Sequence, residues 1–266
     1  MPEGHTLHRL ARLHQRRFAG SPVAVSSPQG RFEAAPVNGR TLRSASAWGK
    51  HLFHHYDDGA IVHVHLGLYG KFTEWARTPG EDLPEAVGQV RMRMVGAEYG
   101  TDLRGPTVCE VIDEGQVADV VARLGPDPIR KDADPIWPWQ RISKSRRPVG
   151  ALLMDQTIIA GVGNVYRNEL LFRHGIDPHR PGQKVGEAEF GDAWTDLVEL
   201  MKIGVRRGKI ITVRPEDDLG APSYGRGRPR TYVYRRAGEP CRVCGTPIRT
   251  AELEGRNLFW CPTCQT

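Results

Sequence analysis

The sequence predicts an α+β protein of more than one domain, in which a β-sandwich precedes a set of helices and a zinc-binding hairpin. Three observations lead to this prediction. Short alternating apolar runs fill residues 23–112, helical periodicity follows residue 148, and two cysteine pairs stand in the last 26 residues. A chain of 266 residues is long enough for two or three such units.

The chain start predicts a helix that begins directly after Glu3. In HTLHRLARLHQRRF, Leu7 and Leu10 are three residues apart, which is helical spacing. An end attached to a packed helix is held in place, which argues against a disordered tail. If Met1 is removed, Pro2 becomes a free secondary amine beside the Glu3 carboxylate. The opening MPEGHT therefore either has no function or provides a catalytic amine and carboxylate, and the other motifs of the chain distinguish these two interpretations.

The next segment alternates with the period of a strand. AIVHVHL places Val62, Val64 and Leu66 on one face and Ile61, His63 and His65 on the other, and QVRMRMV alternates in the same way. Turns rich in Gly, Pro and Asp separate these runs, which predicts an antiparallel sandwich or barrel. We interpret the strand histidines as packed or solvent-facing side chains, because no acidic cluster accompanies them. Cys109, in TVCEVI, is expected to be a small buried apolar residue.

Three stretches then fit helices: VGALLMDQ, NVYRNELLFRHG and EAEFGDAWTDLVELMKIGVRRG. The third carries an apolar stripe of Phe190, Trp194, Leu197, Val198 and Met201. The loop IAGVGN joins two helices and ends in Asn164. This residue can cap the second helix while the glycines make the turn, or the helix start can present N–H groups to an anion. The two interpretations are compatible.

Four of the five cysteines form two C-x-x-C pairs, Cys241/Cys244 and Cys261/Cys264, sixteen residues apart. This spacing predicts a tetrahedral zinc site on two knuckles joined by a hairpin. Disulfides or redox dithiols are the alternatives, and the lack of a secretory signal disfavours them. A segment of about 30 residues cannot bury a sufficient core, so the metal would supply its folding energy.

The net charge of +6 favours a polyanionic partner. Residues 201–236 contain ten Lys and Arg against three Asp and Glu, in a segment that Pro and Gly interrupt. This predicts a basic loop, although a solvated surface is the simpler interpretation. No apolar run is long enough for a bilayer and no signal peptide is recognisable, so we expect a cytoplasmic protein.

Further candidates stand in turns. Lys50 follows Trp48-Gly49 and is expected to open a strand, where a single lysine is usually a surface charge. Leu68 and Tyr69 lie between two glycines, so they are either buried or exposed wedges of the kind that enter a base stack. Arg256 stands at the expected hairpin tip, where it can reach a phosphate or simply be solvated.

Six stretches, taken in order, resemble the bacterial formamidopyrimidine-DNA glycosylase / endonuclease VIII family over the whole chain. They are the PEG start, WGK, HLGLYG, QTIIAGVGNVYRNELLF, YRRAGEPCRVCG and GRNLFWCPTCQ. The likeness is greatest to the actinobacterial endonuclease VIII-like branch. It implies a β-sandwich catalytic domain at 1–133, a helix–two-turn–helix domain with a basic loop at 134–236, and a zinc finger at 237–266. A DNA groove between the domains is also implied.

The resemblance also implies a bifunctional enzyme of base excision repair that removes oxidised bases and cuts the strand by β,δ-elimination. Its implied catalytic set is Pro2 as nucleophile, Glu3 as proton shuttle and Lys50. It implies that Lys50, His65, Asn164 and Arg256 hold phosphates, that Leu68 and Tyr69 fill the gap left by the flipped nucleotide, and that Cys241, Cys244, Cys261 and Cys264 bind one zinc. The implied partner is double-stranded DNA with oxidised bases or abasic sites. We expect a monomer on the nucleoid whose Met1 has been removed.

The chain departs from the family pattern in ways that bear on the lesion. His5-Thr6 replaces the usual Pro-Glu, which affects contacts to base and sugar but not the chemistry at Pro2 and Glu3. The contiguous pair Leu68-Tyr69 is similar to the wedge of the endonuclease VIII branch. In contrast, VRPEDDLGAPSYGRGRPR is long enough for the base-capping loop of the purine branch. Oxidised pyrimidines are our expected substrates, with 8-oxoguanine and formamidopyrimidine, or a non-catalytic damage-binding protein, as alternatives.

Overall fold

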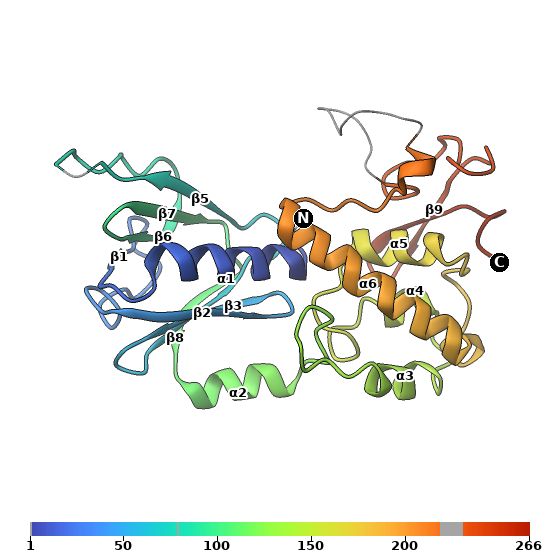
Figure 1. Ribbon diagram of the computed structural model, residues 1–266, viewed down its shortest axis with the longest axis horizontal. Helices are drawn as coiled ribbons and strands as arrows, with labels where there is room; N and C mark the ends of the chain where they lie inside the picture. Colours follow the sequence, from blue (N-terminus) through green and yellow to red (C-terminus); the bar gives the residue numbers. More distant parts are fainter. Residues whose placement is uncertain (1, 79, 219–230) are drawn as a thin grey trace. The chain divides into compact units, whose positions relative to one another are not determined.

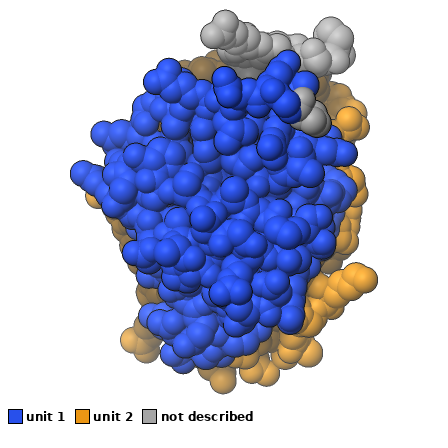
Figure 2. Space-filling model, turned by 90° about the vertical axis from the view of Figure 1, so that its left-hand side faces the viewer, with its two compact units in different colours: residues 1–123 blue, residues 124–266 orange. Residues whose placement is uncertain are grey.

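The computed structural model describes residues 2–78, 80–218 and 231–266, and the chain forms two compact units, 1–123 and 124–266 (Figure 2). Each unit has a hydrophobic core of its own. None of the helices in the described ranges combines the length and hydropathy that crossing a bilayer requires.

The first unit contains two antiparallel four-stranded sheets (Figure 1). One sheet has the order β1-β6-β7-β5, with β1 Ala24–Ser26, β6 Val90–Val95, β7 Tyr99–Arg104 and β5 Lys71–Ala76. The other has the order β2-β3-β4-β8, with β2 Leu42–Trp48, β3 His51–Tyr56, β4 Ile61–His65 and β8 Val108–Ile112. Residues of both sheets share one core, which confirms the predicted sandwich.

Strand β4 is buried on both faces, although its sequence alternates. Val62 and Val64 contribute to the main core. On the opposite face Ile61 forms a smaller cluster with Phe53 and Ile112, covered by helix α2 (Glu114–Ala122). This helix was not expected from periodicity, since it contains no fully buried residue. Its start is a capping box in which the Asp113 side chain accepts from the Gln116 backbone N–H.

Helix α1 (Gly4–Phe18) begins where the spacing of Leu7 and Leu10 predicted. Its buried side, which includes Leu7, Ala11 and Phe18, belongs to the sandwich core. The helix therefore fixes the N-terminal residues to the β-rich unit.

The second unit is helical, with α3 Ile136–Ile142, α4 Val149–Leu152, α5 Asn164–Arg173, α6 Glu187–Arg207 and two 3₁₀ turns, Gly182–Lys184 and Pro215–Asp217. In α6 the predicted stripe is confirmed: four of its residues are buried and Val198 is partly buried. Glu187 in the first turn and Arg207 in the last complement the helix dipole, and Gly208 ends the helix at φ 70°.

The helix expected over VGALLMDQ is shorter than predicted, because α4 has only four residues. Asp155 explains the early end. Its side chain accepts the backbone N–H of Thr157 at 3.0 Å and so favours a turn over another helical residue.

The C-terminal hairpin pairs β9 (Arg249–Leu253) with β10 (Arg256–Trp260). Its two-residue turn has positive φ at both positions, 48° at Glu254 and 71° at Gly255, which is the type I′ geometry. Most of the expected base-capping loop, at 219–230, lies outside the described residues, as does Met1.

Candidate functional site

Pro2 and Glu3 stand immediately before helix α1. Glu3 is the N-cap residue, its backbone carbonyl accepts the Thr6 N–H at 2.8 Å, and its side chain is fully buried. The N-terminus of a helix favours a negative charge. Burial, together with the positive charges of the chain terminus and of His8, lowers the pKa of His5 from 6.5 to about 4. His5 is therefore a neutral ring at pH 7.

Lys50 lies in a turn and does not open a strand as expected. Strand β3 begins at His51, and Gly49-Lys50 form the two-residue connection from β2. Gly49 has φ 56°, the conformation that a hairpin turn of this length requires at its first position. The turn brings Lys50 close to the end of β4, because His51 pairs with His65 in the sheet.

The charges around His65 follow from this pairing. Burial is the largest cause that lowers the pKa of His65, and the proximity of Lys50 and His63 adds to it. Burial and the neighbouring cations likewise lower the pKa of His51 from 6.5 to about 3. No acidic partner of these histidines was expected from the sequence, yet the Glu110 carboxylate on β8 lies 3.0 Å from His63 Nδ1. The Lys50 ammonium thus provides the positive charge beside two neutral rings.

The loop after β4 exposes its apolar tip. Tyr69 is 86% exposed and Leu68 is 40% exposed. The turn is tight, because the Gly70 N–H donates to the Leu66 carbonyl at 2.9 Å and a Cβ on Gly70 would lie 2.2 Å from that oxygen. Of the two alternatives, Leu68 and Tyr69 are therefore exposed and not buried, and they lie on a turn whose backbone is constrained.

Asn164 is the first residue of α5 and not its cap, which is Gly163. Its side-chain amide instead points to the hairpin and donates to the Asn257 carbonyl at 2.9 Å. The Asn164 side-chain oxygen accepts from the Arg167 guanidinium and, at 3.1 Å, from the Asn168 amide. The Phe259 N–H donates to the Asn168 oxygen at 2.7 Å. Helix α5 and strand β10 are thus joined by side chains of one helix face.

Sequence reasoning missed the two partners of Asn164. Arg167 and Asn168 are both buried, and they follow Asn164 at three and four residues. That spacing places them on one face of a helix, which is the signal that could have found them. Their backbone partners on β10 are about ninety residues away and leave no trace in the local sequence.

Arg256 is the first residue of β10 and is exposed at the hairpin tip, as predicted. The turn beside it is held by Arg147, whose guanidinium contacts Glu254 at 2.9 Å and Asp155 at 3.0 Å. These hydrogen bonds raise the pKa of Arg147. The ion pairs fix the hairpin tip to the helical part of the same unit.

Glu169 was also missed. It is fully buried on α5, and its carboxylate accepts the backbone N–H groups of Tyr232, Val233 and Tyr234 at 2.6–2.9 Å. The Thr212 hydroxyl donates to the same carboxylate at 2.5 Å. One side chain therefore fixes both ends of the segment that connects α6 to the zinc-binding hairpin.

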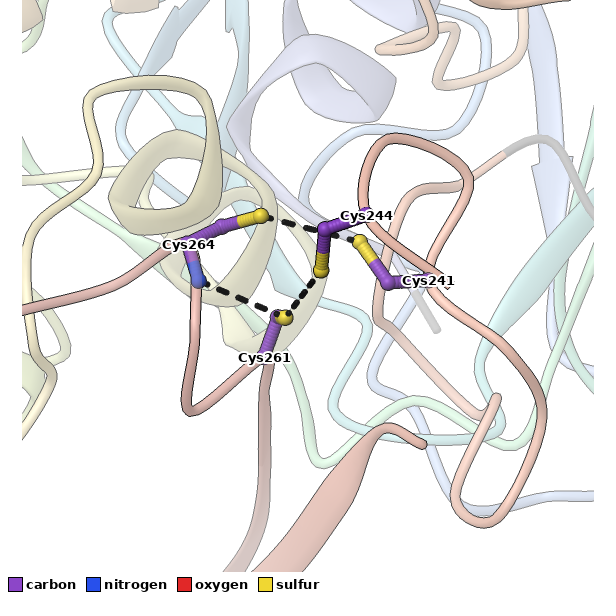
Figure 3. A group of neighbouring side chains, drawn as sticks. All are labelled: Cys241, Cys244, Cys261 and Cys264. Atoms are coloured by element: carbon purple, nitrogen blue, oxygen red, sulfur yellow. Dashed lines mark hydrogen bonds between the residues drawn. The ribbon is translucent and has the colours of Figure 1, made fainter. Parts of the chain in front are cut away.

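The four cysteine sulfurs converge from two knuckles, one before β9 and one after β10 (Figure 3). All four lie within 4.8 Å of one another, and the Cys241–Cys264 and Cys244–Cys261 sulfurs are 3.9 and 3.5 Å apart. A Zn–S distance of 2.3 Å requires tetrahedral S–S edges of about 3.8 Å. The residues fit one structural zinc. Cys109 is apart from them on β8, where burial raises its thiol pKa to about 12.

The expected residues therefore form groups within each unit. In the first unit, Lys50 and His65 are adjacent and the pair Leu68-Tyr69 follows β4, while Pro2 and Glu3 start α1. In the second unit, Asn164 is tied to the strand that carries Arg256, and the zinc ligands flank this hairpin.

Three family models match the chain. The formamidopyrimidine-DNA glycosylase N-terminal domain matches residues 1–106, the formamidopyrimidine-DNA glycosylase H2TH domain matches 124–215, and the zinc finger found in FPG and IleRS matches 238–266. Together they span most of the two units.

Curated relatives agree with these matches. Endonuclease 8 1 of Mycobacterium tuberculosis (strain ATCC 25618 / H37Rv) is 78% identical over 268 residues, covering 100% of both chains. Formamidopyrimidine-DNA glycosylase of Parasynechococcus marenigrum (strain WH8102) is 39% identical over 245 residues, covering 87% of this chain and 85% of that protein. A crystal structure of Lactococcus lactis Fpg with DNA containing an abasic site has a TM-score of 0.80, 22% identity and 99% coverage of both chains. This last likeness concerns the fold.

Proposed function

Because this chain belongs to the formamidopyrimidine-DNA glycosylase / endonuclease VIII family, we propose that it removes oxidised bases from double-stranded DNA and cuts the strand at the resulting site. The observation that carries the proposal is the buried Glu3 carboxylate at the start of α1, directly after Pro2. A DNA-binding module needs neither a secondary amine at its terminus nor a buried carboxylate beside it.

The reaction begins with the amine of Pro2 once Met1 has been removed. Its nitrogen lone pair attacks the sugar C1′, the bond from C1′ to the base breaks, and the base leaves with a proton. The sugar ring opens to give an iminium ion, which is permanently cationic because the amine is secondary. A terminal amine has an ordinary pKa of about 7.7–8.0, against about 10.4 for lysine, so more of it is neutral near pH 7.

Glu3 would move the protons. Its carboxyl group protonates the sugar oxygen as the ring opens, and its carboxylate then accepts the proton that leaves C2′. Loss of that proton breaks the C3′–O bond, and loss of the C4′ proton breaks the C5′–O bond in the same manner. Hydrolysis of the iminium finally returns the amine.

The DNA contacts divide between the units. Lys50 and His65 in the first unit, and Asn164 and Arg256 in the second, would hold phosphates around the lesion, and Leu68 and Tyr69 would fill the space of the flipped nucleotide. The lesion-containing DNA in structures of the same fold supports this partner. Extruding a base costs a few kcal/mol of stacking, part of which inserted side chains offset.

Oxidised pyrimidines are the proposed lesions. Two observations support pyrimidine lesions. A protein named Endonuclease 8 1 is 78% identical over the full length, and the exposed residues Leu68 and Tyr69 are contiguous. Purine lesions are the second candidate, favoured by the glycosylase relative at 39% identity. Duplexes with a single thymine glycol or a single 8-oxoguanine distinguish them: faster cleavage of thymine glycol supports the proposal, and faster cleavage of 8-oxoguanine contradicts it.

Borohydride reduction tests the chemistry. With DNA containing an abasic site, protein lacking Met1 should form a covalent adduct, Pro2→Gly should abolish it, and the exposed control Pro36→Gly should not change it. Glu3→Gln should slow base removal by about 100-fold or more, whereas the exposed control Glu33→Gln should be unaffected. Absence of an adduct from protein that begins at Pro2 would favour a damage-binding protein instead.

A further inference from the structure

The ring of His65 is fixed by its own loop. Its Nδ1 atom lies 3.1 Å from the backbone nitrogen of Gly67, which donates to it, and 2.9 Å from the Thr107 hydroxyl. The same hydroxyl is 3.0 Å from the His65 carbonyl oxygen, and its single proton can be donated to only one of these two acceptors at a time. The Thr107 N–H donates to that carbonyl at 2.9 Å. One residue therefore holds both the backbone and the ring of His65.

These contacts determine where the ring proton resides. A backbone N–H can only donate, so the Nδ1 atom that receives it cannot carry a hydrogen. A neutral imidazole has one proton, and here it must be on Nε2. The free edge of His65 is consequently a neutral N–H donor.

The neighbouring ring has the opposite tautomer. His63 Nδ1 faces the Glu110 carboxylate at 3.0 Å and must donate, so His63 Nε2 accepts. His51 Nδ1, 2.8 Å from that atom, therefore carries the proton. The assignment of His63 rests on the carboxylate, and that of His51 follows from His63.

Three basic side chains stand around His65. They are Lys50 in the β2–β3 turn, His51 on β3 and His63 on its own strand, while Arg123 acts on His51. Glu110 on β8 is the acidic group of this cluster, and His63 uses it. Burial lowers the pKa of His65, and the nearby Lys50 and His63 lower it further.

We propose that Thr107 and Gly67 are positioning residues that hold His65 as a neutral Nε2–H donor to a DNA phosphate, leaving Lys50 to provide the charge of that contact. This rests on the proposed function, in which His65 and Lys50 bind phosphate. The division of roles has a thermodynamic signature. Replacing a lysine that neutralises a phosphate reduces the salt dependence of binding by about one unit of slope, whereas replacing a neutral donor leaves it unchanged.

Gly67 is required at its position for a second reason. Its φ is 64°, and a Cβ there would lie 2.4 Å from the Thr107 Cγ2 atom. Gly67→Ala would therefore push away the side chain that holds the ring, and we expect it to weaken DNA binding as Thr107→Val does.

The first measurement uses the ¹⁵N signals of the His65 ring in the zinc-loaded, full-length protein without DNA. At pH 7 we expect Nδ1 to give the signal of an unprotonated nitrogen and Nε2 to give that of an N–H, and we expect the ring to titrate with a midpoint below 6.5. An Nδ1–H signal at pH 7, or a titration midpoint at or above 6.5, would overturn the inference.

The second measurement is the affinity for duplex DNA with a tetrahydrofuran abasic analogue, taken over a range of salt concentrations. Thr107→Val should weaken binding by about 3–10-fold, the value of one hydrogen bond, and Thr107→Ser should restore it. His65→Ala should keep the wild-type salt slope while Lys50→Ala lowers it. Unchanged affinity in Thr107→Val, or a reduced slope in His65→Ala, would contradict the proposed roles.

These outcomes are separable from the fate of the proposed enzyme. The ring signals are read without DNA, and the binding measurements need no catalysis. A missing borohydride adduct together with the expected ring signals would reject the glycosylase chemistry alone. A normal adduct with a protonated Nδ1 would reject this inference alone.

Discussion

The Asn164 side-chain amide donates to the backbone carbonyl of Asn257 across 2.9 Å, joining the start of α5 to the strand that carries Arg256. Both residues are in the second unit, so this bond sets the hairpin against the helix independently of the β-rich unit. A residue implied by resemblance to contact phosphate thus also positions another such residue.

Asn164→Ala should weaken binding to lesion-containing duplex by at least about tenfold, because it removes a proposed phosphate contact and leaves the Arg167 guanidinium, at 3.3 Å, as the remaining donor to the Asn257 carbonyl. The measurement is a titration of labelled DNA at fixed salt. The exposed Gln183→Ala in the same unit is the control. Equal affinities in both variants would argue against any role for Asn164 at the DNA.

Removal of zinc should unfold the hairpin and leave the β-rich unit folded. The small core that includes Ile248 and Phe259 also contains the ligands Cys241 and Cys261, so the metal and this core should be lost together. Cys244→Ser should reduce the bound zinc below one per chain and abolish tight DNA binding.

Metal analysis and amide exchange of the two units would measure both effects. Cys109→Ser is the matched control, because this cysteine lies on β8 in the other unit. A Cys244→Ser protein that kept a full zinc and normal DNA affinity would exclude the four-cysteine site.

Tyr69→Ala should impair function without affecting stability. The ring is 86% exposed, so its loss should change the free energy of unfolding by less than about 0.5 kcal/mol. Base extrusion, followed with a fluorescent base beside the lesion, should be slower by about tenfold, since stacking of one aromatic on bases is worth about 1–3 kcal/mol. Val87→Ala, which is also exposed in the first unit, should change neither quantity.

Acidification should destabilise the β-rich unit through His54. Burial, with the nearby His14 and His55, lowers the pKa of His54 well below 6.5. The unfolded chain therefore binds a proton between pH 6.5 and the lower folded pKa, and stability falls as pH falls through this window. The loss that His54 contributes should not exceed about 1.4 kcal/mol per pH unit within this window.

Urea unfolding at pH 7.5, 6 and 5 would measure this loss, and His54→Phe should reduce it even if the variant is less stable at every pH, while His5 and His51 keep their own share. The ring nitrogen His54 Nδ1 is buried without a hydrogen-bond partner among the described residues, so no acceptor there offsets the added proton. A wild-type stability that rises on acidification would show that the sign of the effect is wrong.

Local patterns predicted much of this molecule. The spacing of Leu7 and Leu10 predicted α1, and the spacing of the cysteine pairs predicted the cluster of four sulfurs. The exposed tip at Leu68 and Tyr69 was one of two alternatives that the flanking glycines allowed. These features depend on neighbours in sequence, where periodicity and turn geometry are informative.

The remaining features depend on partners that are distant in sequence. Helix α2 has a weak apolar face, and the only local signal for it was the Asp113–Gln116 capping box. The position of Lys50 depends on where the turn between β2 and β3 falls. The same residues are also compatible with a longer β3 strand that begins at Lys50. The local sequence does not distinguish Arg167 from other helical arginines, because its contact with strand β10 depends on the tertiary fold.

The carboxylate of Glu169 has a consequence for how this protein can change over time. Thr212 and Tyr232 are anchored to the same side chain on α5. A segment of different length between those two positions would therefore still start and end at the same places in the structure. The chain can in this way vary in length between these two positions while α5 and the metal-bound end that follows keep their fold.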